Sequence, residues 1–152
     1  MTTPLRFGLI GTGRIGQVHA ANIAADPEAT LAWVCDPFVE GAEAVSARHG
    51  GTVTTDAAAM FASGEIDAVL IASPTATHVD LLGAALDAGV PALCEKPIDL
   101  DAVMTALDRL DYDGWIVVEQ DVLNAPDADL SAFRTERGAD QLVNRDALRE
   151  WA

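Results

Sequence analysis

The chain has 152 residues, of which 50% are apolar and 22% are charged. This composition is typical of a folded globular domain and excludes disorder as the main state. The chain carries 9 Lys and Arg residues against 24 Asp and Glu residues, which gives a formal net charge of −15. Because such a charge repels phosphate backbones and anionic lipid surfaces, we expect neither a nucleic-acid partner nor a membrane partner.

The N-terminal residues lack a basic region followed by a long apolar stretch, and no apolar run reaches the roughly 18 residues that a membrane-spanning helix needs. We therefore expect a cytoplasmic location. The two cysteines, Cys35 and Cys94, lie in apolar runs and have no CxxC spacing. They are expected to be buried, reduced thiols, and no metal site is predicted.

Short apolar runs alternate with helical patterns along residues 1–98. The predicted strands cover residues 5–10, 31–35, 52–54, 68–72 and 90–94. The predicted helices cover residues 14–25, 38–48, 57–62 and 77–88. In the first of these helices, the side expected to face the core carries Ile15, Val18, Ala21 and Ile23.

The predicted strands are short and apolar on both faces, which is typical of a parallel sheet covered by helices on each side. Right-handed crossovers then give a doubly wound, Rossmann-like α/β fold. Beyond Pro97, the pattern predicts a helix over 101–110 and a strand over 115–119, which would be the sixth strand of the same sheet. We therefore expect one α/β domain over residues 1–122 and a helical C-terminal extension over residues 123–152.

A glycine-rich turn joins the first predicted strand to the first predicted helix. It reads GxGxxG and consists of Gly11, Thr12, Gly13, Arg14, Ile15 and Gly16. In this context the first glycine permits the tight turn, the second lets a pyrophosphate approach the backbone, and the third lets the helix pack close to the strand. The start of the helix then offers free N–H groups to the phosphates. The candidates for dinucleotide binding in this turn are therefore Gly11, Gly13, Arg14, Ile15 and Gly16, with a purely structural turn as the alternative.

Asp36 lies 20 residues after Gly16, at the end of the second predicted strand. A carboxylate there can accept hydrogen bonds from the adenosine ribose and repels a 2′-phosphate, so NAD is favoured over NADP. The alternative is a structural Asp that caps the next helix. Together with the glycine-rich turn, Asp36 makes residues 1–122 a predicted NAD-binding domain.

Three stretches of this chain resemble the Gfo/Idh/MocA oxidoreductases over residues 1–100, with the inositol 2-dehydrogenase type as the most similar in character. They are the glycine-rich stretch 11–20, the loop Ser73-Pro74-Thr75-Ala76-Thr77-His78, and the sequence Cys94-Glu95-Lys96-Pro97, which matches the family's Glu-Lys-Pro signature. The resemblance implies that Ser73, Pro74, Thr75 and Glu95 lie near the nicotinamide side of the cofactor. It also implies that Pro97 shapes its turn, often through a cis bond.

The same resemblance implies that Lys96 contacts the substrate and polarises the reacting hydroxyl. Independently of it, Lys96 is the only lysine in the chain and follows a predicted strand, at the edge where open α/β sheets bind ligands. A solvated surface lysine is the alternative. His78 is a candidate for cofactor contact or for a structural role in its loop, and His19 is expected to take part in packing.

Members of this family continue into a second, substrate-binding domain with an acid/base histidine, whereas no histidine follows Pro97 here. We therefore expect a single domain that lacks the substrate domain. Residues 110–121 and 144–149 resemble instead the last strand and closing helix of sugar phosphate isomerase/epimerase barrels of the inosose dehydratase type. This change predicts a gene fusion near residue 100. Glu119 matches a metal ligand of those barrels, but one strand cannot supply the several ligands that a metal requires.

The favoured function is the NAD-binding part of a polyol or sugar dehydrogenase that transfers hydride from a carbinol carbon, with low or no turnover by this chain. The alternative is a non-catalytic NAD-binding or interaction module. The sheet face that the second domain covers in the family would be exposed, so we also expect a homo-oligomer that forms through that face.

Overall fold

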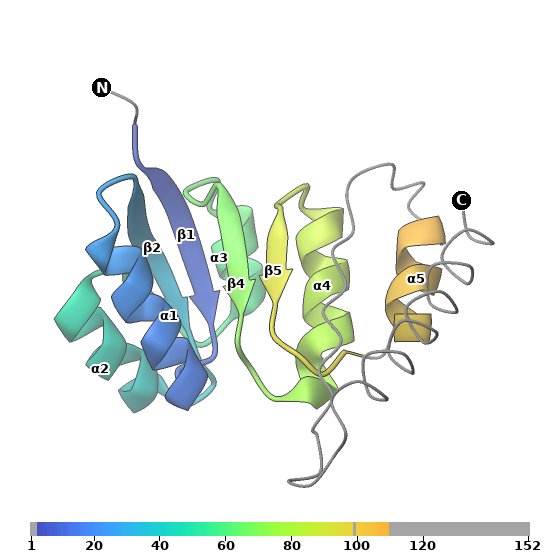
Figure 1. Cartoon of the computed structure of the whole chain (residues 1–152), viewed down its shortest axis with the longest axis horizontal. Coiled ribbons are helices and arrows are strands. Elements are labelled where there is room, and N and C mark those ends of the chain that lie inside the picture. The colour runs from blue at the N-terminus through green and yellow to red at the C-terminus, as the bar shows by residue number, and fades with distance from the viewer. Residues whose placement is uncertain (1–2, 99, 110–152) are drawn as a thin grey trace, which may run out of the picture. The chain divides into compact units, whose positions relative to one another are not determined.

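A computed structural model of the chain describes residues 3–98 and 100–109, in which strands and helices alternate (Figure 1). The strands are β1 (Leu5–Ile10), β2 (Ala29–Cys35), β3 (Thr52–Thr54), β4 (Ala68–Ile71) and β5 (Ala92–Cys94). The helices are α1 (Arg14–Ala25), α2 (Val39–His49), α3 (Ala57–Ala62), the 3₁₀ turn η1 (Thr75–Thr77), α4 (His78–Asp87) and α5 (Leu100–Arg109). This alternation confirms the predicted succession of elements.

The strands form one parallel sheet in the order β3-β2-β1-β4-β5. The order reverses between β1 and β4, which is the topological switch point at which doubly wound sheets bind ligands. The register places Ile10, the last residue of β1, opposite Cys35 and Ile71, the last residues of β2 and β4. The carboxyl ends of these strands therefore meet at one edge, and the predicted doubly wound α/β fold is confirmed.

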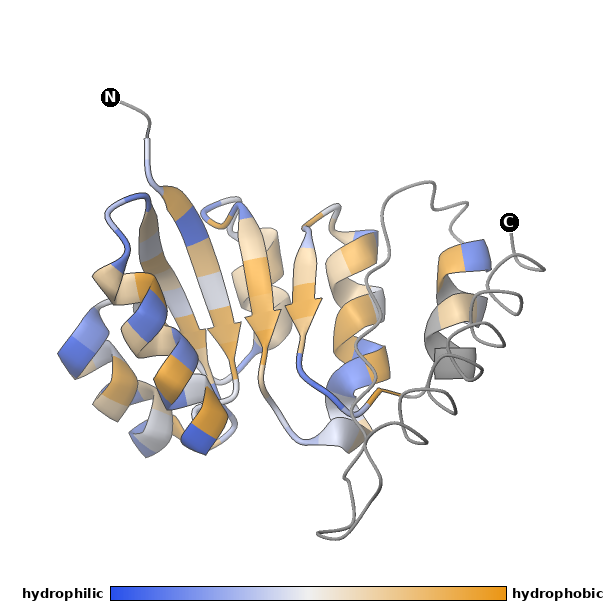
Figure 2. Ribbon diagram, viewed as in Figure 1, coloured by the Kyte–Doolittle hydropathy of each residue, from blue (hydrophilic) through white to orange (hydrophobic). Residues whose placement is uncertain are grey.

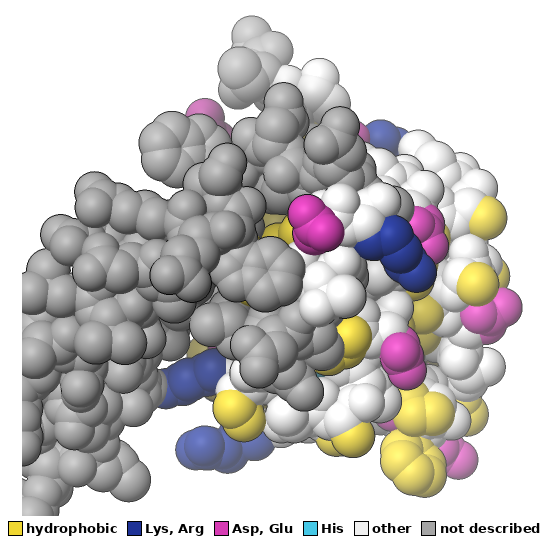
Figure 3. Space-filling model, turned by 90° about the vertical axis from the view of Figure 1, so that its right-hand side faces the viewer, with side chains coloured by type: hydrophobic (Ala, Val, Ile, Leu, Met, Phe, Trp, Pro, Cys, Tyr) yellow, Lys and Arg dark blue, Asp and Glu magenta, His cyan; other side chains and the backbone are white. Residues whose placement is uncertain are grey.

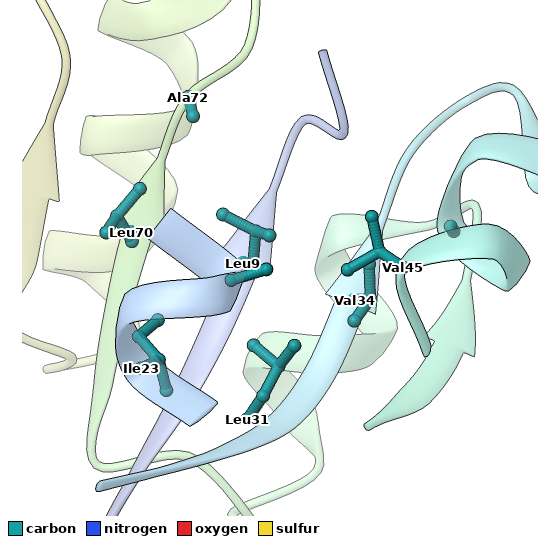
Figure 4. Close-up of a cluster of buried hydrophobic side chains, with 9 residues drawn as sticks. Leu9, Ile23, Leu31, Val34, Val45, Leu70 and Ala72 are labelled. Atoms are coloured by element: carbon teal, nitrogen blue, oxygen red, sulfur yellow. The ribbon is translucent and has the colours of Figure 1, made fainter. Parts of the chain in front are cut away.

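Two hydrophobic clusters lie on opposite faces of the sheet. Helices α1 and α2 cover one face, where Leu9, Val34 and Leu70 of the strands pack with Ile23 and Val45 of the helices (Figure 4). Helices α3 and α4 cover the other face around Met60, Val69, Ile71 and Ala85. Figure 2 shows β4 as hydrophobic along its length, while the helices carry polar and apolar residues in turn. Since each fully buried Leu, Val or Ile contributes about 1.5–3 kcal/mol, the central strands anchor the fold.

Three strand boundaries differ from the predicted ones, and one of them is the end of β4, which lies at Ile71 rather than at residue 72. Strand β2 begins at Ala29 rather than at residue 31, because the N–H of Leu5 already donates to the carbonyl of Glu28 over 2.7 Å. Strand β5 begins at Ala92 rather than at Val90. The N–H of Val90 donates back to Ala85 of α4, and the next residue, Pro91, has no N–H to give to a sheet.

The predicted buried side of α1 is wrong at three of its four residues. Ile15 and Val18 are 39% and 49% exposed, and Ala21 is also exposed. The buried residues of α1 are instead Gly16, Ala20 and Ile23. They recur at helical spacing, and the first two are small, so the helix axis lies close to the sheet. The prediction from hydrophobicity missed these small buried residues because it gave most weight to large apolar side chains.

Helix α5 confirms the helix predicted over residues 101–110, within one residue at each end. The predicted strand over 115–119, the extension over 123–152 and Glu119 lie outside the described residues. Within the described ranges, no helix is long and apolar enough to cross a membrane. Among the described residues that Figure 3 shows, acidic, basic and hydrophobic side chains are interspersed.

Candidate dinucleotide and substrate site

The loops after four strands line the carboxyl edge of the sheet. Main-chain hydrogen bonds set their starting points: Gly11 donates to Cys35 over 2.8 Å, and Ala72 donates to Ile10 over 2.7 Å. On the other side, Glu95 donates to Ile71 over 2.8 Å. The sheet therefore brings together at one edge the glycine-rich turn, Asp36, the loop that starts at Ser73, and the Glu95–Pro97 turn.

Two glycines of the turn are required by the fold itself. Gly11 has a φ of +96°, and a Cβ there would lie 2.6 Å from the backbone of Ala72. A Cβ on Gly16 would overlap the carbonyl oxygen of Gly11. Any side chain at these two positions would force apart β1, β4 and α1, so both glycines have the structural roles that the motif predicts.

Gly13 differs from both, because nothing in the protein requires a glycine there. Its φ of −62° and ψ of −173° are open to any residue, and a Cβ on it would meet no atom within 4 Å. Gly13 is also the N-cap of α1, and no side chain caps the helix. Open space therefore lies beside the uncapped N–H groups, which fits the pyrophosphate of a dinucleotide. Arg14 and Ile15 follow as exposed first residues of α1.

Asp36 is held as an oriented carboxylate after β2. Its Oδ2 accepts from the N–H and the hydroxyl of Thr12 over 2.8 and 2.7 Å, and its Oδ1 accepts from the N–H of Phe38 over 2.9 Å. Burial by itself would raise the pKa of Asp36, but these hydrogen bonds outweigh it, and the pKa lies below its ordinary value. A carboxylate has about four acceptor positions, so three bonds leave room for about one further donor, such as a ribose hydroxyl.

Two residues that the sequence analysis missed belong to this arrangement. Thr12 is 7% exposed and links the glycine-rich turn to Asp36 through both of its donors. Gly41 of α2 faces the pair, since a Cβ there would overlap the Thr12 hydroxyl and lie 3.9 Å from Cγ of Asp36. A glycine inside a helix is costly, so Gly41 was the available signal.

His78 connects two loops. It is 1% exposed, with Nε2 placed 2.8 Å from the carbonyl oxygen of Ser73 and Nδ1 placed 3.0 Å from that of Pro97. Both ring nitrogens are thus engaged by main chain, which favours the structural alternative for His78. The Ser73 loop is further closed by a 2.7 Å hydrogen bond between the hydroxyls of Ser73 and Thr77, while Pro74 and Thr75 stay exposed.

His19 does more than the packing expected of it. Its Nε2 lies 2.6 Å from Oε1 of Glu95, and the two side chains are 22% and 24% exposed. This contact joins α1 to the Glu95–Pro97 turn. The hydrogen bond from His19 is the main cause that lowers the pKa of Glu95, ahead of the opposing effect of burial.

Lys96 lies in the turn that follows β5, between Glu95 and the cis Lys96–Pro97 bond. The cis bond agrees with what the family resemblance implied for Pro97. Both cysteines were expected to be buried. Cys35 is buried, but Cys94 is only partly buried, because β5 is the last strand at its end of the sheet as described. Within residues 3–98 and 100–109, no group of three or more His, Cys, Asp or Glu residues could hold a metal ion.

Comparison with known proteins identifies the family. A family model for an oxidoreductase family with an NAD-binding Rossmann fold, Gfo/Idh/MocA, matches residues 5–119. An inositol 2-dehydrogenase of Rhizobium meliloti (strain 1021) is 48% identical over 98 residues, which cover 64% of this chain and 29% of that protein. The chain spans about a third of the length of the curated relatives that it matches.

Solved structures agree with this comparison. A myo-inositol dehydrogenase from Corynebacterium glutamicum is 45% identical with a TM-score of 0.66, over 71% of this chain and 33% of that chain. The scyllo-inositol dehydrogenase from Lactobacillus casei with bound NAD(H) and scyllo-inositol is 29% identical with a TM-score of 0.65, over 72% and 34%. This chain therefore belongs to the Gfo/Idh/MocA oxidoreductase family and carries its NAD-binding Rossmann domain.

Proposed function

We propose that this NAD-binding domain serves the oxidation of a CH–OH group on an inositol or a similar polyol. The observation that carries the cofactor part is Gly13, whose open position beside uncapped amides leaves room for a pyrophosphate. The substrate part is supported by the relatives, several of which are inositol 2-dehydrogenases. NAD, when bound, supplies a nicotinamide ring that takes up hydride from the substrate carbon.

The residues of this chain have separate tasks in this proposal. The amides at the start of α1 hold the pyrophosphate, with Arg14 and Ile15 beside it. Asp36 accepts from a ribose hydroxyl and repels a 2′-phosphate, which selects NAD over NADP. Ser73, Pro74 and Thr75 line the nicotinamide side. These assignments rest on the positions of the loops along one edge of the sheet.

Lys96 is the proposed catalytic residue. Its ammonium group donates a hydrogen bond to the reacting hydroxyl, which stabilises negative charge on that oxygen as its proton passes to solvent water. Lys96 follows β5 as the loop from Ser73 follows β4, so both reach the same edge of the sheet. Glu95, its neighbour, lies on the side of α1.

The domain boundary and the tail remain proposals. The match to the family model runs through residue 119, which supports a domain that continues to about residue 122, and the sixth strand over residues 115–119 stays a prediction. Because the match continues past residue 100, it does not require a junction there, and the predicted fusion with an isomerase-like segment stays a prediction. The homo-oligomer also stays a prediction, which light scattering tests. The cytoplasmic location is likewise a prediction.

A turnover assay tests the proposed activity. The purified chain is incubated with NAD and myo-inositol, scyllo-inositol or glucose, and NADH formation is followed by absorbance. The proposal expects NADH with at least one inositol and a loss of about a hundredfold or more in Lys96→Met, as for removal of an oxyanion donor. NAD binding without NADH formation from any polyol would favour the non-catalytic module. The same assay tests the expected low turnover.

A further inference from the structure

The Glu95–Lys96–Pro97 turn is held from two helices on opposite faces of the sheet. From α1, His19 contacts the Glu95 side chain at 2.6 Å. From the start of α4, His78 contacts the Pro97 carbonyl oxygen at 3.0 Å. Lys96 lies between the two tethered residues. The turn follows β5, which has only three residues and is 55% exposed at Leu93, so these side-chain contacts supplement a short stretch of sheet.

We propose that His19 is a positioning residue, which fixes the Glu95–Pro97 turn against α1 and thereby couples the pyrophosphate-binding helix to the placement of Lys96. The inference rests on the proposed function in assigning Lys96 to the substrate. His78 completes the bracing from the other face, because it also contacts the Ser73 carbonyl and so ties the turn to the loop after β4.

The charges explain why a histidine suits this place. The carboxylate of Glu95 is adjacent in sequence to the ammonium of Lys96, which adds to the larger effect of the His19 hydrogen bond in lowering the pKa of Glu95. The contact of Oε1 with His19 holds the Glu95 carboxylate on the side of α1. Without His19, that carboxylate is left to water and to the neighbouring ammonium. The turn then gains conformations in which Lys96 points elsewhere, at a cost to substrate alignment.

The proposed coupling links the start of α1 to the Glu95–Pro97 turn, and it can be measured at both places. His19 lies in the second turn of α1, the helix that Gly13 caps and Arg14 begins. A cofactor that orders the start of α1 therefore also orders the turn that carries Lys96. By reciprocity of linkage, loosening that turn weakens NAD binding.

The single lysine gives a clean probe. Labelling with ¹⁵N-lysine yields one backbone amide signal, that of Lys96, in an NMR spectrum of the full chain. In His19→Ala we expect this signal to shift, its hydrogen exchange to quicken by about tenfold or more, and the Kd for NAD to rise by about fivefold. His19→Gln, whose amide can still donate to Glu95, should restore most of each effect. The matched control His49→Ala, at the end of α2, should change none of them.

A second route avoids dependence on one variant. Glu95→Ala should reproduce the change in the Lys96 signal, and the double variant should add little to it, because both remove the same contact. A Lys96 signal that is unchanged in folded His19→Ala and Glu95→Ala proteins would overturn the proposal. The NMR comparison needs no cofactor or substrate. A failure of the wild-type chain to bind NAD or oxidise polyols would therefore count against the proposed function. The role of His19 in holding the turn would still be tested by the NMR comparison.

Discussion

The two halves of the site differ in what holds them in place. The half around Gly11–Gly16 and Asp36 is fixed mainly by main-chain packing and by donors of the neighbouring turn. The half around Ser73 and Glu95–Pro97 is fixed by two histidines that reach across 76 and 19 residues of sequence. Substitutions that add side-chain atoms should therefore perturb the first half most. Substitutions that remove a single hydrogen bond should perturb the second half most.

The largest expected effect is a difference in the free energy of unfolding between alanine variants of two glycines of the same motif. Gly16→Ala should destabilise the fold by about 3 kcal/mol or more, because its Cβ overlaps the Gly11 carbonyl. Gly13→Ala should leave the stability within about 1 kcal/mol of wild type, and can raise it, because its backbone angles suit alanine and its Cβ meets nothing. Urea unfolding measures both. Equal losses in the two variants would contradict the division into structural and cofactor glycines.

The next effect concerns cofactor choice. In Asp36→Ala, the affinity for NAD should fall by about tenfold, and the preference for NAD over NADP should narrow, because the repulsion of a 2′-phosphate is gone. Calorimetric titration with both dinucleotides measures this. Glu40→Ala, an exposed acid in the first turn of α2, is the matched control and should keep the preference. An unchanged NAD/NADP ratio in Asp36→Ala would remove Asp36 from the site.

A pH effect follows from the lowered pKa of Asp36. A carboxylate with a lowered folded-state pKa stabilises the protein above its unfolded-state pKa of about 3.9, and this stabilisation is lost as the pH falls through the folded-state value. Asp36→Asn should therefore cost about 1–3 kcal/mol between pH 5 and 7, with a difference that shrinks below about pH 4. Urea unfolding of both proteins across this range measures it. A difference that grows on acidification would be the wrong sign.

A further prediction concerns the reactivity of the two thiols. Burial is the main cause that raises the pKa of Cys35 and of Cys94 to about 11, and the nearby carboxylates Asp36 and Glu95 add to it. At pH 8 roughly one thiol in a thousand is then ionised, so a disulfide reagent should react about a hundredfold more slowly with the folded chain than with free cysteine. Fast labelling of one thiol per folded chain would contradict this.

Sequence reasoning predicted the backbone geometry of the glycine-rich turn, because the residues that determine it are neighbours in the sequence. A GxGxxG turn between a strand and a helix specifies positions within a few residues, and Gly11, Gly13 and Gly16 have the geometry that the motif implies. The sequence pattern likewise predicted the five strands and the five α-helices of the described residues, but not the 3₁₀ turn η1. The buried side of α1 was wrong because close packing against a sheet selects Gly16 and Ala20, which a hydrophobicity pattern does not highlight.

The second half could not be predicted in the same way. The contact of His19 with Glu95 exists only because the sheet order places α1 and the end of β5 at one edge, and no spacing in the sequence encodes it. Thr12 occupies a variable position of the glycine motif, so its two bonds to Asp36 have no signature either. The family resemblance located Lys96 and Pro97, but the residues that brace them required the fold.

The central claim is that open space beside the uncapped start of α1 holds the pyrophosphate of NAD. Calorimetric titration of NAD into the wild-type chain and into Gly13→Val tests it most directly, with urea unfolding to establish that the variant is folded. We predict measurable binding by the wild type and a loss of roughly a hundredfold or more in folded Gly13→Val. Equal affinities in the two folded proteins would contradict it.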